Sequence, residues 1–159
     1  MTELKQATLR DLLSLHTGIL EELRDRGITR SANNITGDLG EYLFCLAFGW
    51  AQAPNSEKGF DAVDNYGHRY QIKARRIHRR NGSRQLSAIR DFASFDQLAA
   101  VLFDDEFHIF RAALIPREIV KSQSTYHAHT NSYRFLLRDQ IWETPGVLDV
   151  TDQLQRVTA

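Results

Sequence analysis

The chain has 159 residues with 20 basic and 20 acidic side chains, so its formal net charge at pH 7 is zero and favours no class of partner. The length predicts one domain with a buried core, and the hydrophobic fraction of 42% is that of an ordinary globular protein. No apolar run approaches the roughly 20 residues that cross a bilayer, so we expect no membrane partner, and the acids near the N-terminus argue against a signal or transit peptide.

Two helices are predicted in the first fifty residues. Leucines and isoleucines recur at helical spacing from residue 4 to residue 26, which predicts an amphipathic helix ended by Gly27. A second helix is predicted from Thr36, as its N-cap, to about Trp50. This segment is apolar on nearly all sides, so we expect it to be buried. It contains the single cysteine, Cys45, which cannot form an internal disulfide and therefore indicates a reducing, cytoplasmic setting.

A β-hairpin is predicted next, with strands at residues 59–61 and 70–75 and a turn at residues 65–67. Successive side chains of a strand point to opposite faces. One face of the second strand therefore carries an amide, an ammonium and a guanidinium group, from Gln71, Lys73 and Arg75. Together with the carboxylate of Asp61 at the end of the first strand, this is an unusual set for a sheet that only has to pack.

The rest of the chain predicts further strands and short helices. Residues 76–87 are typical of an exposed basic loop, and residues 92–98 of a short helix. The apolar run 99–103 predicts a central strand covered on both faces, followed by a strand over 107–115. The C-terminal part predicts a short helix opened by Pro116, a loop over 122–132, strands over 133–137 and 147–150, and a final helical turn capped by Thr151. This order indicates an α/β sandwich around a mixed sheet.

Basic residues are concentrated in one part of the chain. Between residues 69 and 90 the sequence has no acid and these basic residues: Arg69, Lys73, Arg75, Arg76, Arg79, Arg80, Arg84 and Arg90. Such local asymmetry lets a neutral protein present a face that binds polyanions. The alternative interpretation is a solvated basic loop with no ligand.

The hairpin residues fit the chemistry of a metal-dependent phosphodiesterase. Asp61 can hold a divalent cation, Gln71 can lend a neutral oxygen, and Lys73 can lie near the attacked phosphate or water. Simpler explanations exist, because Asp61 could end a loop and Lys73 could protect an edge strand from aggregation. Glu41 could be favoured by the helix dipole, yet a carboxylate among bulky apolar neighbours costs several kcal/mol unless it is paired.

This arrangement resembles the PD-(D/E)xK nuclease superfamily, in which a helix supplies an acid and a hairpin supplies an Asp and a (Glu/Asp/Gln)-x-Lys. The matching residues are Glu41, Asp61, Gln71 and Lys73, and the match spans residues 36–76, with the strands to residue 115 fitting the rest of the core. The Mrr-like and Holliday-junction-resolvase-like branches are the most similar. Two departures stand out, because Phe60 replaces the proline of the motif and Gln71 replaces its second acid.

The resemblance implies a restriction-endonuclease-like fold over residues 1–159 as one domain. The N-terminal helix would occupy residues 1–28, the core 36–121, and the C-terminal strands and short helix 122–159. It also implies a Mg²⁺-dependent endodeoxyribonuclease, in which Mn²⁺ can substitute and which acts on duplex or branched DNA as a homodimer. The metal would be held by Glu41, Asp61, Gln71 and the carbonyl of Ile72.

The remaining implied roles concern the phosphate. Lys73 would orient water and offset the charge on the attacked phosphate. Five arginines would track the DNA backbone, namely Arg75, Arg76, Arg79, Arg80 and Arg84.

Two other hypotheses remain open from the sequence. The first is a catalytically inactive nucleic-acid-binding module of the same fold, with the neutral Gln71 as the sign of lost turnover. The second is a protein-interaction component, such as a toxin, an antitoxin or a phage-defence component, whose charges serve a protein partner. Cleavage of plasmid DNA with Mg²⁺ or Mn²⁺ distinguishes the first hypothesis, and binding to DNA, RNA and heparin distinguishes the second.

Overall fold

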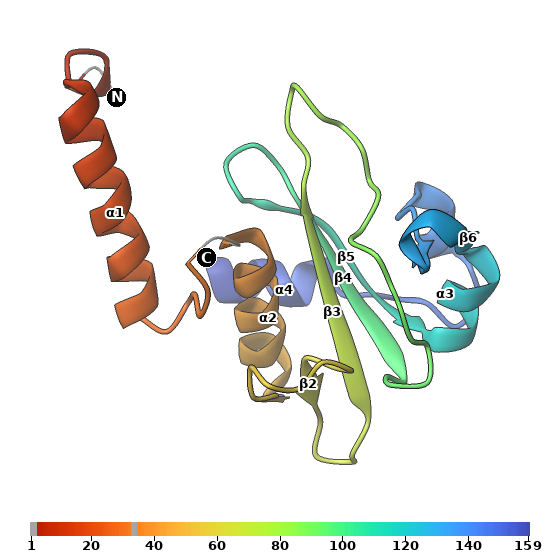
Figure 1. Ribbon diagram of the computed structural model, residues 1–159. Coiled ribbons are helices and arrows are strands. Elements are labelled where there is room, and N and C mark those ends of the chain that lie inside the picture. Colours follow the sequence, from red (N-terminus) through yellow and green to blue (C-terminus); the bar gives the residue numbers. More distant parts are fainter. Residues whose placement is uncertain (1–2, 33–34) are drawn as a thin grey trace.

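A mixed β-sheet lies at the centre of the computed structural model, which describes residues 3–32 and 35–159 (Figure 1). The sheet has six strands in the order β1-β2-β3-β4-β5-β8, and only β3 and β4 run parallel to each other. The strands are β1 (Ala51–Gln52), β2 (Ala62–Val63), β3 (Arg69–Arg76), β4 (Gln97–Phe103), β5 (Ile109–Pro116) and β8 (Leu148–Asp149). The predicted α/β class with a mixed central sheet is therefore confirmed.

Helices cover the two faces of this sheet. On one face lie α2 (Ile35–Phe48) and α4 (Thr151–Thr158), which enclose one apolar core with the sheet. The opposite face is covered by α3 (Arg117–Gln123), by the 3-10 helix η3 (Asp139–Glu143) and by the segment 77–95. Figure 1 shows α2 and α4 on one side of β3 and α3 on the other.

The central strand β4 separates the two cores. Leu98, Ala100 and Leu102 belong to one core and Ala99, Val101 and Phe103 to the other, and all of them are fully buried. The prediction of a doubly covered strand is confirmed, although the strand begins at Gln97.

The helix predicted over residues 92–98 is wrong, because this segment forms a turn that leads directly into β4. Phe92 and Phe95 are buried in the core that α3 covers. The Asp96 carboxylate accepts hydrogen bonds from the backbone and the side chain of Arg69 on β3, at 2.8 and 3.2 Å. These tertiary contacts take the place of helical hydrogen bonds.

The hairpin of β2 and β3 is confirmed, but its first strand lies at Ala62–Val63 and not at the predicted residues 59–61. Its register pairs Ala62 with Tyr70, so residues 59–61 precede the strand. The turn is closed by the Asp64 side chain, whose Oδ1 accepts the N–H groups of Tyr66 and His68 at 2.9 Å. Gly67 has a φ of +84°, a left-handed conformation that favours glycine.

The helix α2 lies directly on β3. A Cβ atom built on Gly40 would be 2.9 Å from the Cβ of Ala74, so only a glycine permits this distance. The helix begins at Ile35, and Thr36 therefore lies inside its first turn instead of capping it. The predicted full burial is also wrong, because only one side of the helix is buried and Leu46 on the other side is 51% exposed.

The last third of the chain contains more regular structure than predicted. A second, two-stranded sheet pairs β6 (Thr125–His127) with β7 (Ser132–Arg134), where a loop and a longer strand were expected. The predicted cap Thr151 is the first residue of α4, and its hydroxyl donates to Asp149 Oδ1 at 2.6 Å.

The N-terminal helix α1 (Leu9–Asp25) stands apart from the sheet (Figure 1). It begins five residues later than predicted, because Thr8 forms a capping box with Asp11 and the preceding turn is a separate 3-10 helix, Glu3–Lys5. It ends, as predicted, before Gly27, whose φ is +71°.

The close approach at Gly40 gives a testable prediction. In Gly40→Ala the added methyl group would overlap Ala74, and overpacking of this kind costs about 1–3 kcal/mol. The double variant with Ala74→Gly should recover part of the free energy of unfolding, by about 1 kcal/mol relative to the sum of the single changes. Urea unfolding of the four proteins measures this coupling.

The matched control is Gly18→Ala on α1, where a new Cβ would meet nothing within 4 Å. This change should only add helix propensity, worth up to about 1 kcal/mol. Strictly additive effects of the Gly40 and Ala74 changes would contradict the packing of α2 on β3.

Candidate metal and nucleic-acid cleft

The candidate site lies along the edge of β3 beyond the end of β2. Asp61 precedes β2 and turns over this edge, where its N–H donates to the Tyr70 carbonyl at 2.8 Å. Its carboxylate Oδ2 accepts the backbone N–H of Ile72 at 2.7 Å. The N–H and C=O of one strand residue point to the same side, so the Ile72 carbonyl also faces this edge.

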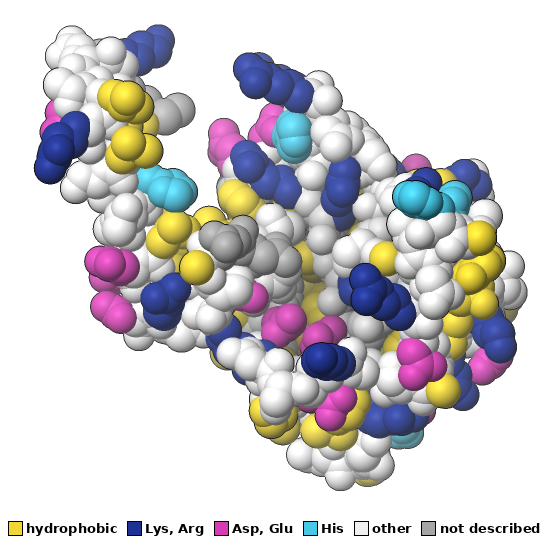
Figure 2. All heavy atoms as spheres, viewed as in Figure 1, with side chains coloured by type: hydrophobic (Ala, Val, Ile, Leu, Met, Phe, Trp, Pro, Cys, Tyr) yellow, Lys and Arg dark blue, Asp and Glu magenta, His cyan; other side chains and the backbone are white. Residues whose placement is uncertain are grey.

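A cleft of about 680 Å³ opens here, between the N-terminal half of α2, β3 and the segment 76–88. Its lining includes Glu41 from α2, Asp61 before β2, and Ile72 and Lys73 from β3. The structure therefore brings four sequence-predicted site residues together, although they come from three separate segments. Figure 2 shows acidic and basic side chains gathered around the hollow in the middle of the body.

Two residues that the sequence did not single out hold the carboxylate of Glu41. The side-chain amide of Gln52 on β1 donates to Oε2 at 2.9 Å, and the Arg30 guanidinium lies 3.3 Å from the same oxygen. Arg30 also donates to the Ala53 carbonyl at 3.0 Å, which fixes its position. No spacing in the sequence connects Arg30 or Gln52 with the hairpin motif.

Burial shifts the pKa of each titratable group in this set towards its neutral form. It raises the pKa of Glu41, against the hydrogen bond from Gln52 and the charge of Arg30. It also raises the pKa of Asp61, against the Ile72 N–H and the charge of Lys73. Burial lowers the pKa of Lys73, against the charges of Asp61 and Glu41. Such a group of perturbed residues in one cleft is typical of a functional site.

Gln71 lies on β3 between Tyr70 and Ile72 but is not among the residues that line the cleft. Its side-chain oxygen is buried and has no hydrogen-bond partner within residues 3–32 and 35–159. An unpartnered buried amide oxygen costs about 1–3 kcal/mol, and a water or a cation is the kind of partner that would satisfy it.

The donor set fits a hard divalent cation. The carboxylates of Glu41 and Asp61 and the carbonyl of Ile72 supply only oxygen, the ligand atom that Mg²⁺ prefers. In the described part of the chain, no three His, Cys, Asp or Glu side chains are grouped so that they could hold a metal. A metal in this cleft would therefore depend on the Ile72 carbonyl as well as on the two acids, because Gln71 does not line the cleft.

Four of the five predicted DNA-binding arginines fall into two groups. Arg75 and Arg76 line the cleft, whereas Arg79 and Arg80 are exposed on the following turn. The guanidinium of Arg76 donates to the Asp105 carbonyl and lies 4.6 Å from the centre of the Phe107 ring.

Arg84 forms an ion pair with Asp139 at 2.6 Å, and its guanidinium lies 5.4 Å from the centre of the Phe110 ring. The Arg84 side chain is only 25% exposed. Arg76 and Arg84 therefore have structural partners that the sequence did not reveal.

A second polar cavity, of about 260 Å³, shares Gln85 with the cleft. Its lining includes His127, Arg134 and Arg138 from the β6–β7 region and contains no acid. Within the described residues, neither arginine side chain forms a hydrogen bond or an ion pair. Sequence reasoning missed this basic surface, because it lies far along the chain from the hairpin motif.

Comparison with known proteins does not assign the chain to a family. No protein-family model matches it, and no curated protein matches it either. Among the helices of the described residues, none has the length and apolarity needed to cross a membrane. The function must therefore be argued from the cleft itself.

The raised pKa of Asp61 predicts how this residue affects folding stability. Because the folded pKa exceeds the unfolded one, the ionised carboxylate lowers the free energy of unfolding at neutral pH, and this penalty disappears below the unfolded value of about 3.9. Asp61→Asn, which keeps an acceptor for the Ile72 N–H, should therefore raise Tm at pH 7–8 without divalent cations. The difference should shrink as the pH falls towards 4.

The matched control is Asp25→Asn on α1, at an exposed position where no gain is expected. Thermal unfolding followed by circular dichroism measures all three proteins. A lower Tm for Asp61→Asn than for the unchanged protein at pH 7 would mean that the carboxylate is a stabilising partner and not a destabilising one.

Proposed function

We propose that the protein is a Mg²⁺-dependent endodeoxyribonuclease with the restriction-endonuclease-like fold. The observation that carries this proposal is the meeting of Glu41, Asp61 and Lys73 in one cleft, where burial shifts the pKa of all three. The mixed sheet between two helical layers is compatible with that fold. The acid-free basic cavity beside the cleft supports a polyanionic substrate.

In this proposal the carboxylates of Asp61 and Glu41 and the Ile72 carbonyl would hold the cation, whereas Gln71, the fourth ligand expected from the sequence, does not line the cleft. When bound, Mg²⁺ would polarise the attacked phosphate and lower the pKa of a water molecule. The Ile72 N–H fixes the orientation of Asp61 through their 2.7 Å hydrogen bond. Lys73, half-buried beside both acids, supplies positive charge where negative charge develops on the phosphate.

A nucleic-acid-binding module without turnover is the second candidate. Two observations favour it, because Glu41 is already paired with Arg30 and Gln52, and Gln71 does not line the cleft. The first feature lowers the negative charge available to a cation, and the second lowers the number of oxygen ligands. The two candidates share a DNA partner and differ only in cleavage.

We also propose a cytoplasmic location, on the basis of the single cysteine. Cys45 is half-buried on α2, and burial raises the pKa of its thiol to about 11. A thiol with so high a pKa is rarely ionised and reacts slowly. The residue is therefore suited to a structural role in a reducing compartment.

The first test is cleavage of supercoiled plasmid DNA in the presence of Mg²⁺ or Mn²⁺. Asp61→Asn and Lys73→Ala should each lower the rate by about two to three orders of magnitude, since each removes a charge that acts on the transition state. Lys121→Ala, an exposed lysine on α3, is the matched control and should keep the full rate.

Full activity in Asp61→Asn or Lys73→Ala would refute the site. Absence of cleavage with either metal, together with salt-dependent DNA binding by the unchanged protein, would favour the module without turnover. A protein that neither cleaves nor binds DNA, RNA or heparin would favour the protein-interaction hypothesis.

The second test concerns the exposed arginines. If Arg79 and Arg80 contact phosphates, Arg79→Ala combined with Arg80→Ala should lower the slope of log affinity against log salt by about two. Tm should change little, because the Arg79 side chain is 96% exposed and surface charges contribute little to stability. Fluorescence anisotropy with duplexes of several sequences measures the affinity.

Lys121→Ala combined with Arg156→Ala removes the same charge from α3 and α4 and is the control. It should leave the slope nearly unchanged. A fall in Tm on the loss of Arg79 and Arg80, or an affinity that ignores salt, would place these arginines in a protein contact.

A further inference from the structure

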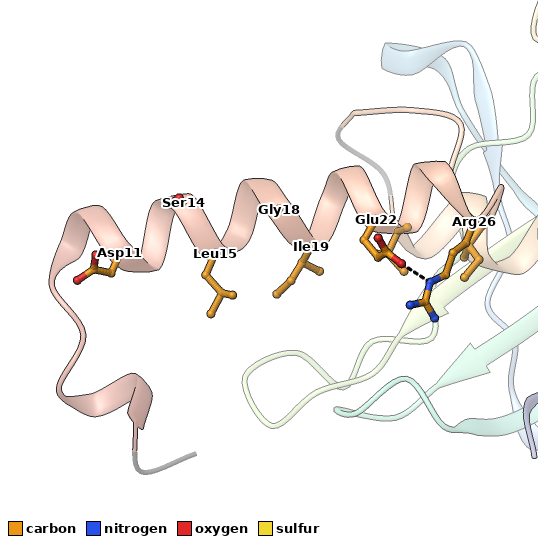
Figure 3. Close-up of a pocket in the computed structure, with 9 residues that line it drawn as sticks. Asp11, Ser14, Leu15, Gly18, Ile19, Glu22 and Arg26 are labelled. Carbon is orange, nitrogen blue, oxygen red and sulfur yellow. Dashed lines mark hydrogen bonds and ion pairs between the residues drawn. The ribbon is translucent and has the colours of Figure 1, made fainter.

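The helix α1 exposes an apolar stripe. None of the residues of α1, all of which the structure describes, is buried, and Leu9, Leu13 and Ile19 are 74%, 59% and 51% exposed. Figure 2 shows hydrophobic side chains along this helix. In Figure 3, Ile19 points away from Ser14, and Leu15, which lies beside the stripe and is 49% exposed, points to the same side as Ile19. The stripe is made of Leu9, Leu12, Leu13, His16, Ile19, Leu20 and Leu23.

Such a helix gains little from its own chain. The capping box at Thr8 and the 2.6 Å ion pair between Glu22 and Arg26 are local interactions, and an exposed i,i+4 pair contributes only about 0.3–0.5 kcal/mol. An isolated helix of this length is marginal in water, and most helices depend on burial of the apolar face. A partner surface is therefore required.

The stripe has the same pattern in both directions from His16. Apolar residues lie three, four and seven positions before it and three, four and seven positions after it. At about 100° per residue, all of them lie within about 60° of the direction of His16. A surface that matches itself after a half-turn is what a two-fold, isologous interface requires.

We propose that α1 binds α1 of a second copy of this chain, in an antiparallel pair with His16 at the two-fold axis. Leu12 and Leu13 of each copy then lie opposite Ile19 and Leu20 of the other, and Leu9 lies opposite Leu23. Every apolar position of the stripe is covered by another apolar position. No other segment of the chain is needed to complete the interface.

Charges outside the stripe do not oppose this pairing. Arg10 and Glu21 lie about 120° and 140° from the direction of His16, so they flank the contact, and Arg10 of each copy comes level with Glu21 of the other. On the other side of the stripe Asp11 approaches Glu22, but Glu22 is already paired with Arg26 of its own chain. The inference depends on α1 alone and does not rest on the proposed nuclease activity.

The test uses two variants, each of which should prevent dimerisation alone, and which should form a dimer when they are mixed. Leu12→Lys and Ile19→Glu should each shift the protein from dimer to monomer, because each places two unpaired charges in the interface. Mixed in equal amounts, they should form a heterodimer, in which one new Lys–Glu pair faces one unchanged Leu–Ile pair. Analytical ultracentrifugation of the full chain measures the masses, with Ser14→Lys on the opposite side of α1 as the control.

A second measurement tests the same contact without introducing charges, so it does not depend on whether the charge variants fold well. In a Cys45→Ser background, His16→Cys should form a disulfide between two copies under mild oxidation, and Ser14→Cys should not. A monomeric unchanged protein at tens of micromolar would overturn the proposal. Two other results would also overturn it. One is a dimer that persists in both charge variants, and the other is a mixture of the two variants that stays monomeric, since each requires another surface or another partner.

Discussion

The contact between Gly40 and Ala74 is the constraint on which the site depends. With no side chain at position 40, α2 lies close enough to β3 for a new Cβ to stand 2.9 Å from that of Ala74. Glu41 is the next residue of α2, so this close packing places it at the rim of the cleft beside Lys73. A bulkier residue at position 40 would move the helix outward, and the carboxylate would separate from the strand that holds the other two groups.

This close packing also explains the electrostatics of the cleft. Two acids and a lysine share a partly dehydrated space, so burial opposes the charged form of each one. Gln71 adds a buried oxygen with no partner in the described chain. A folded chain keeps such groups at a cost in stability, and a cation bound in the cleft would offset the part that comes from the two acids.

Patterns that depend on nearest neighbours were readable from the sequence, and patterns that depend on tertiary contact were not. The apolar run of β4 and the alternation along β3 correctly indicated the sheet. Asp61 and Lys73 line one cleft, and their role as a site stays a prediction. The prediction of a helix over residues 92–98 was wrong, because its two phenylalanines are buried in the core by a turn. Arg30 and Gln52 could not be found, since only the fold brings them to Glu41.

The partners of the arginines show where the acids lie that make the net charge of the chain zero. Acids that balance the basic run lie beside it in space, since Asp105 pairs with Arg79 and Asp139 with Arg84. Arg76 is held by the backbone carbonyl of Asp105. The positive face is therefore smaller than the sequence suggests. It is also displaced, because Arg134 and Arg138, whose guanidinium groups have no partner among the described residues, border a cavity that adjoins the cleft through Gln85. Under the proposed function, a phosphate chain leaving the cleft would follow this border, so recognition of a polyanion would depend on β7 and Arg138 as much as on the loop that follows β3.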